Sequence, residues 1–183
     1  MAWSNIFLQL TTLVGPIFGE GQAAPPFTGQ IELLDFKWDM TAHKNPEAKA
    51  GFGLSLTGAA SSFLGVGGNE VQINLGKLTF KKRADAASAQ IMLALDNKVP
   101  VVLASITVLN IQNLVGPVRD PGYNLTVTGG YFSDVSLKLQ SSQMGAELVE
   151  DVTMNFTGIT ITYMRKVDAI NAHTPTVPFF FKK

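Results

Sequence analysis

The stretch that decides the fold is LTFKKRADAASAQIMLAL (residues 78–95), where a strand pattern changes into a helix pattern. Its first half alternates apolar and polar residues, which is typical of a β-strand with one buried face. Asp85 follows, a residue type whose carboxylate caps the start of a helix. Between Ala86 and Asn97 apolar residues recur at helical spacing, and Pro100 limits the pattern. We therefore predict a strand joined to one helix by a short charged turn.

Working outward, alternation with period two indicates strands on both sides of this unit. In the second candidate strand Leu34, Phe36, Trp38 and Met40 are expected to share one face. At Gly76 the apolar phase flips, which predicts a β-bulge, and the phase flips again at Gly158. The full set of expected strands covers residues 6–10, 29–40, 71–80, 99–111, 123–140 and 147–165.

These patterns predict a mainly β fold: an antiparallel β-barrel or sandwich of six to eight strands with one flanking α-helix. A chain of 183 residues fits a single domain, 1–183. Two segments depart from the regular pattern, a glycine-rich loop at 41–69 and an irregular tail at 167–183 that ends in Phe179–Phe181. A loop of that length is usually functional or disordered. Its scattered apolar residues favour one that docks on another surface.

The strand expected at 99–111 is apolar on both parities. A strand that is apolar on both faces is covered on both faces. One cover is the barrel core, and the other is either the helix or a neighbouring subunit. For a neighbouring subunit, the candidate contact residues are Val101, Leu103 and Leu109.

The composition points to self-association. Hydrophobic residues make up 46% of the chain and charged residues 15%, against about 25% charged in an average domain. Acidic and basic residues balance at 14 each, so no global field attracts nucleic acid. No apolar stretch approaches the ~20 residues of a membrane-spanning helix. The segment Met1–Leu10 lacks a basic region and is interpreted as a strand rather than a secretory signal.

Catalytic and metal-binding motifs are not found in the sequence. There is no cysteine, and His43 and His173 lack ligand spacing, so we expect surface histidines, no cofactor and no metal. The basic run Lys81–Arg83 is interpreted as a solvated rim or an inter-subunit ion pair, and only less readily as a phosphate contact. Glu147, Glu150 and Asp151 are interpreted as a solvated turn. We do not expect an enzyme.

The order of these elements resembles the haemolysin-coregulated protein (Hcp) family of type VI secretion systems. The similarity lies in GQIELLDFKW (residues 29–38), in residues 78–95, and in VTMNFTGITITY (residues 152–163). Residues 6–10 also fit. The chain departs from the family at Asn97–Lys98, where members often have a glycine after the helix.

The resemblance implies a protomer that closes into a homohexameric ring, and rings that stack into a secretion tube. The implied partners are the spike protein and sheath of the machine, with small effector proteins inside the ring. The protein would be cytoplasmic before firing and then secreted without a signal peptide. The family's long loop reaches the neighbouring ring, which assigns that contact here to Phe52, Leu54, Phe63 and Leu64. The strand face formed by Ser136, Lys138 and Gln140 either lines the lumen or is ordinary solvent-exposed surface.

Two alternatives keep the same fold. One is a monomeric barrel that binds a small apolar ligand. The other is the tube protein of a phage-tail-like particle, which would also form rings.

Overall fold

The computed structural model describes residues 5–21, 27–44, 71–109, 121–142, 145–163 and 179–182. These residues form one helix and eleven strands. The elements are β1 (Ile6–Thr12), β2 (Gly15–Ile17), β3 (Ile31–Trp38), β4 (Thr41–Lys44), β5 (Val71–Asn74), β6 (Leu78–Arg83), α1 (Ala86–Asp96), β7 (Val101–Leu109), β8 (Pro121–Ser142), β9 (Gly145–Asn155), β10 (Gly158–Tyr163) and β11 (Phe179–Lys182).

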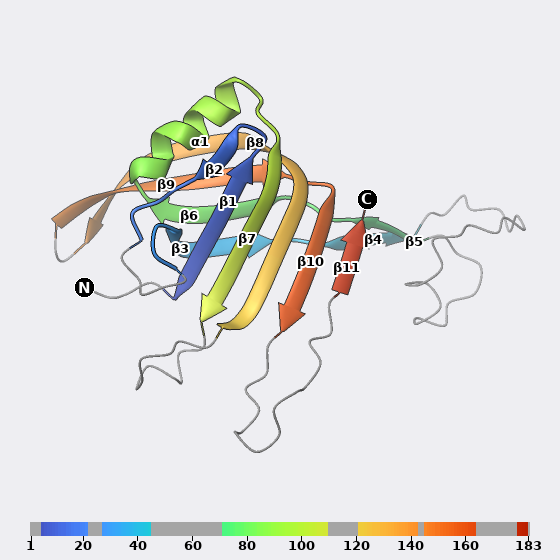
Figure 1. Cartoon of the computed structure of the whole chain (residues 1–183). Helices are drawn as coiled ribbons and strands as arrows, with labels where there is room; N and C mark the ends of the chain where they lie inside the picture. The colour runs from blue at the N-terminus through green and yellow to red at the C-terminus, as the bar shows by residue number, and fades with distance from the viewer. Residues whose placement is uncertain are drawn as a thin grey trace, which may run out of the picture.

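Six of these strands close a barrel in the order β7, β1, β3, β6, β9, β8, with β8 returning to pair with β7. All the pairings are antiparallel. Figure 1 shows two layers: β1, β7, β8 and β10 lie side by side in front, and β3, β6 and β9 cross behind them. The predicted antiparallel barrel with one flanking helix is confirmed. Strands β2, β10 and β11 extend this sheet, and β4 and β5 form a separate two-stranded sheet, so the number of strands exceeds the predicted six to eight.

The barrel closes because one long hairpin bends. β8 pairs with β9 through its second half and with β10 through its first half, so β9 and β10 act as one strand that changes layer. The bend lies at Gly129 and Gly130. Gly129 has a φ of +63°, and a Cβ there would overlap the hydroxyl of Thr157. A Cβ on Gly130 would lie 2.6 Å from the Asn155 carbonyl oxygen, so the corner requires glycine at both positions.

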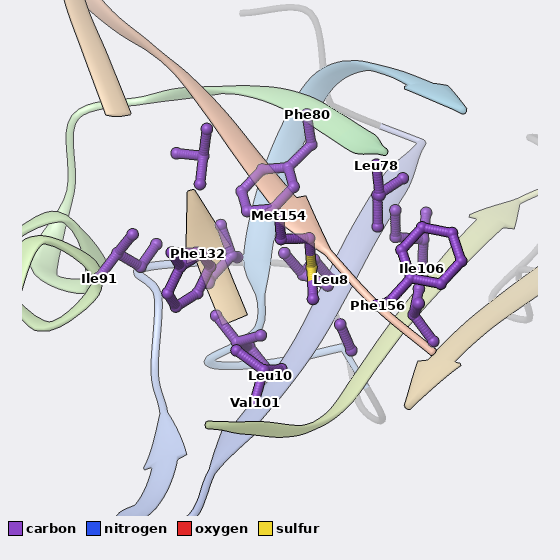
Figure 2. Close-up of a cluster of buried hydrophobic side chains, with 14 of the residues drawn as sticks. Leu8, Leu10, Leu78, Phe80, Ile91, Val101, Ile106, Phe132, Met154 and Phe156 are labelled. Atoms are coloured by element: carbon purple, nitrogen blue, oxygen red, sulfur yellow. The ribbon is translucent and has the colours of Figure 1, made fainter. Parts of the chain in front are cut away.

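The core lies between the two layers and follows the predicted alternation. Leu8 of β1 pairs with Ile106 of β7, which pairs with Leu125 of β8, and all three are buried. Phe80 and Met154 contribute from the other layer, and Ile91 contributes from the helix (Figure 2). Tyr123 packs at the edge of this core, where burial raises the pKa of its hydroxyl.

The helix begins and ends close to its predicted bounds. The Asp85 carboxylate accepts a hydrogen bond from the Ala87 amide, and the Ser88 hydroxyl accepts one from the Asp85 amide, which forms a capping box. Ile91 lies on the buried face. After the helix Lys98 adopts a φ of +52°, a left-handed conformation that glycine adopts at much lower cost.

Two bulges change which residues face the core. The register of β3 against β6 shifts between Leu33 and Asp35, so Leu34 is an extra residue and is 36% exposed. Leu34 therefore does not share the inner face, contrary to our expectation, and Ile31 and Leu33 fill that part of the core instead. A second register shift occurs where Thr11 and Thr12 of β1 pair with β7. Val102 is skipped in this pairing, and Val101 therefore faces inward.

The predicted bulge at Gly76 is wrong. β5 and β6 are separate strands on either side of it, and each pairs with a different partner: β5 with β4, and β6 with β3. The predicted loop at 41–69 therefore starts with a strand, β4. The predicted irregular tail likewise includes a strand, because β11 pairs with β10. No helix within the described ranges is both long and apolar enough to cross a bilayer.

Candidate assembly surfaces

A buried ionic cluster fixes the helix to the barrel. The Lys82 side chain, from β6, is fully buried. Its ammonium lies 2.6 Å from Asp85 Oδ1 at the start of α1 and 2.9 Å from Glu150 Oε2 on β9. It also donates to the Arg83 carbonyl at 2.8 Å and to the Ser88 hydroxyl at 3.0 Å. The amine therefore joins the junction of β6 and α1 to β9, which is distant in sequence.

Glu150 is the least satisfied member of this cluster. Its side chain is 1% exposed, and neither of its oxygens accepts a hydrogen bond from the described residues. A lysine ammonium has three donors, and here they are directed at Arg83, Asp85 and Ser88. The contact between Lys82 and Glu150 is therefore an ion pair without a directed hydrogen bond.

This cluster corrects two predictions. Lys82 does not belong to a solvated rim, because the pleat turns it inward between Lys81 and Arg83. Glu147, Glu150 and Asp151 do not form a turn either, since all three lie on β9 and Glu150 faces inward. The sequence pattern does not show that a charged residue is buried when its neighbours along the strand are also charged but exposed.

Among the described residues, the outward positions of β1, β7, β8 and β10 in the front layer carry no charge. We call this surface the hydroxyl face. It consists of the outward residues of β1, β7, β8 and β10 apart from Phe7, which has the same parity but is buried against Phe27. These residues lie in cross-strand rows: Gln9, Thr11, Leu103, Ser105, Thr107, Asn124, Thr126, Thr128, Thr160 and Thr162. The row through Ser105 runs from Gln9 across to Thr126 and Thr160. All members except Leu103 are polar, and most are half-buried.

Side chains in the middle of the hydroxyl face bond to one another. Asn124 donates through its amide to the Ser105 and Thr107 hydroxyls, each at 3.0 Å. The Thr126 hydroxyl donates to the Asn124 side-chain carbonyl at 2.8 Å and lies 3.3 Å from the Ser105 hydroxyl. Much of the hydrogen-bonding capacity of this surface is therefore already used within the protomer.

The outer surface of the back layer is charged. We call it the charged face. Its members are Asp35, Lys37, Thr79, Lys81, Arg83, Asp134, Ser136, Lys138, Glu147, Asp151 and Thr153. Lys138 donates to Asp151 at 2.7 Å, and Arg83 pairs with Glu147. The hydrogen bond to Asp151 and then its charge raise the pKa of Lys138 above its ordinary value. The two layers thus present outer surfaces of different chemistry.

The β8–β9 hairpin projects beyond the barrel as an arm (Figure 1, left). Its inward column continues from the core: Val152 is buried, but Leu137, Leu139 and Leu148 are 48%, 70% and 40% exposed. Leu139 pairs directly across from Leu148. The arm therefore carries an apolar surface that the protomer itself leaves uncovered.

The predicted site residues fall in different environments. Val101 and Leu109 are 1% and 3% exposed, so they have almost no surface left for a neighbour (Figure 2 shows Val101 among the core side chains). The register shift that skips Val102 turns Val101 into the main core, whereas Leu109 is buried in a separate small cluster with Phe7 and Phe27. Leu103 is half-buried on the hydroxyl face.

The other predicted contacts stay predictions. Ser136 and Lys138 lie on the charged face, and Gln140 continues their outward row along the arm. Phe52, Leu54, Phe63 and Leu64 lie outside the described residues, and so does His173. His43 lies on β4. Among the described residues no group of three metal-ligating side chains comes together.

We did not predict the hydroxyl face from the sequence, because no motif marks it and its distinguishing feature is the absence of charged residues. Threonine and serine alternate with apolar residues in β7, β8 and β10, and each strand by itself looks like an ordinary half-exposed strand. Only the pairing registers show that the uncharged stretches are neighbours.

Comparison with known proteins identifies the family. The family model described as "Type VI secretion system effector, Hcp" matches residues 7–163. The chain therefore belongs to the Hcp family of type VI secretion systems. No curated protein matches the chain.

Solved structures of Hcp proteins share the fold at low sequence identity. The Hcp1 protein of the E. coli EAEC 042 pathovar has a TM-score of 0.66 and 15% identity, covering 97% of this chain and 98% of that chain. Hcp1 from Salmonella typhimurium has a TM-score of 0.62 and 15% identity, with coverages of 97% and 95%. The secreted protein Hcp3 from Pseudomonas aeruginosa has a TM-score of 0.62 and 12% identity, with coverages of 97% and 96%.

Proposed function

We propose that this chain is a structural subunit of the type VI secretion tube, which assembles into homohexameric rings that stack and carry effector proteins. The single observation that carries the proposal is the match of the family model across residues 7–163. In this role the chain is not an enzyme and functions as one domain, 1–183. Its partners are other copies of itself, the spike and sheath of the machine, and effectors, and it leaves the cytoplasm by secretion.

The chemistry of the protomer supports self-association. A closed ring needs a heterologous interface, in which one surface of the chain fits a different surface of the next copy. The arm leucines, at 40–70% exposed, supply apolar area for one such surface. Since Val101 and Leu109 are occupied in the core, Leu103 remains the member of the predicted interface with free surface. The loop residues Phe52, Leu54, Phe63 and Leu64 are proposed to contact the next ring.

The native mass of the purified protein tests this proposal. Six copies of 19.7 kDa give about 118 kDa by size-exclusion chromatography with light scattering. A peak at that mass with annular particles in negative stain is the expected result. A monomer at high concentration would contradict the ring and favour the apolar-ligand barrel. Binding to a phage tail protein rather than a type VI spike would favour the phage-like alternative.

A further inference from the structure

We propose that Trp38 is a positioning residue, whose indole N–H fixes the direction in which the two-stranded ribbon of β4 and β5 leaves the barrel. The inference rests on the proposed function, because the chain between these two strands, residues 45–70, carries the side chains proposed to contact the next ring. In a symmetric assembly that contact is repeated in every copy, so the ribbon has to leave every protomer in the same direction. A ribbon that is already oriented also loses less entropy when two rings meet.

The ribbon does not simply continue the barrel strands. The last pair of the barrel at this point joins Trp38 to Leu78, and the first pair of the ribbon joins Thr41 to Asn74. Two residues (39 and 40) separate these pairs on one side and three (75, 76 and 77) on the other, so the ladder is interrupted and the ribbon forms its own sheet. Figure 1 shows the ribbon extending away from the barrel on the right. Backbone pairing alone therefore does not fix its orientation.

One side-chain hydrogen bond crosses this interruption. The Trp38 indole Nε1 donates to the Leu75 backbone carbonyl at 2.6 Å. Trp38 is the last residue of β3 and packs against the edge of the core, while Leu75 directly follows β5 and is only 2% exposed. The bond therefore joins a side chain that the barrel anchors to the backbone at which the ribbon ends, and a rotation of the ribbon would break it.

Gly76 makes this tether necessary. It has a φ of +64°, and a Cβ there would overlap the Asp39 backbone carbonyl oxygen, so the two sides of the junction pass close to each other. Its amide donates to the Asn74 side-chain carbonyl at 3.0 Å, a bond within one side of the junction. Glycine has the widest range of backbone conformations of any residue, so the ribbon would pivot at this point if nothing crossed the junction.

The hydrogen bond of Trp38 can be separated from its packing. Trp38→Phe removes the indole N–H but keeps an aromatic side chain against the core. Phe36→Leu is the matched control, because Phe36 is also a partly buried residue of β3 packed against the core, and its aromatic side chain has no donor. If Trp38 only stabilised the barrel, the two variants would leave the ribbon in the same orientation.

Spin-label distances within one chain measure the orientation of the ribbon. The chain has no cysteine, so Lys44→Cys, at the end of β4, and Gln90→Cys, at an exposed position of α1, introduce the two labelling sites. The labelled protein is mixed with an excess of the same variant without cysteines, so that only distances within one protomer are measured by pulsed electron paramagnetic resonance. Negative-stain images of the same proteins without cysteines give the fraction of rings found in stacks.

We expect one narrow distance distribution in the otherwise unchanged protein and in Phe36→Leu, and a broader distribution in Trp38→Phe. Of the two variants, Trp38→Phe alone should show fewer stacked rings, while its native mass stays that of a ring. An unchanged distribution in Trp38→Phe would overturn the inference. A broad distribution with undiminished stacking would overturn the link between the ribbon and the next ring.

Two further outcomes are kept distinct. If the unmodified rings do not stack, that part of the proposed function fails, and the distance distribution still decides whether Trp38 fixes the ribbon. If Trp38→Phe does not fold, Gly76→Ala serves as the second variant, because it keeps the indole and forces the two sides of the junction apart. The distance should then shift, and an unshifted distance would overturn the inference.

Discussion

At Lys82 the chain buries a charge among two carboxylates, a hydroxyl and a carbonyl. A buried ion pair adds little net stability compared with an apolar replacement of the whole group. Removing one member is costly, because the remaining charges stay buried without compensation. The cluster therefore acts mainly as a positional lock among β6, α1 and β9.

Replacing Lys82 with Met should strongly destabilise the protomer, by about 3–5 kcal/mol, because Asp85 and Glu150 lose their cation. Glu150→Gln should cost less, since the Glu150 oxygens accept no hydrogen bond from the described residues. Urea unfolding of each variant measures the loss. Lys81→Met, the neighbouring lysine on the outer face, is the control. A Lys82→Met variant as stable as this control would contradict the locking role.

Lys98 holds a left-handed conformation after the helix, with a φ of +52°. Lys98→Gly should stabilise the protein by about 0.5–1 kcal/mol, because glycine adopts this conformation without the steric cost of a Cβ. Asn97→Gly is the matched control and should destabilise, since Asn97 has a φ of −84° and its amide donates to the Leu93 carbonyl. The thermal midpoints of both variants test the prediction, and a lower midpoint for Lys98→Gly would refute it.

Lys138 should titrate above its ordinary pKa of 10.5, because Asp151 accepts its hydrogen bond and attracts its charge. A raised pKa in the folded state contributes stability that is fully present below the unfolded pKa and is lost as the pH rises through the folded pKa. The effect therefore appears only in strongly alkaline solution. Nuclear magnetic resonance titration of the lysine side chain measures it. In Asp151→Asn the pKa should fall, and an unchanged pKa would exclude Asp151 as the cause.

At the scale of elements, the corner at Gly129 decides whether the long hairpin can serve both layers. Gly129→Ala should destabilise because of its positive φ and because its Cβ would overlap the Thr157 hydroxyl. Thr157→Ala removes that hydroxyl but leaves the backbone strain. The two changes should therefore couple in a double-mutant cycle, with part of the loss recovered in the double variant. Strictly additive free energies of unfolding would show that backbone strain alone requires the glycine.

The bulges act at the same scale, and they account for most of the differences from the sequence prediction. An extra residue reverses the inside and outside of everything beyond it. This is why Leu34 is outside and Val101 is inside. In β7, which is apolar on both parities, alternation alone cannot locate such a residue, because either phase gives an acceptable pattern. In β3 two leucines, Leu33 and Leu34, are adjacent, so the sequence does not show which of them faces inward.

For the whole molecule, the apolar arm is the surface that most needs a partner. Replacing both Leu139 and Leu148 with Asn should leave unfolding of the isolated protomer nearly unchanged, because both side chains are already exposed. The ring should dissociate at about tenfold higher protein concentration or more, since apolar contact area is lost between copies. Light scattering across a dilution series measures this. Gln140→Ala on the same arm is the control, and equal dissociation of both variants would remove the arm from the interface.

By itself the sequence determined the fold class, the helix with its Asp85 cap, and the Hcp resemblance, because these depend on local periodicity and on the order of the elements. Tertiary structure decided which charges are buried and which outer surface is neutral. Lys82 meets Glu150, and Thr126 meets Ser105, only after strands distant in sequence are paired in a definite register. Burial and electrostatic environment are properties of that pairing, so no single strand pattern contains them.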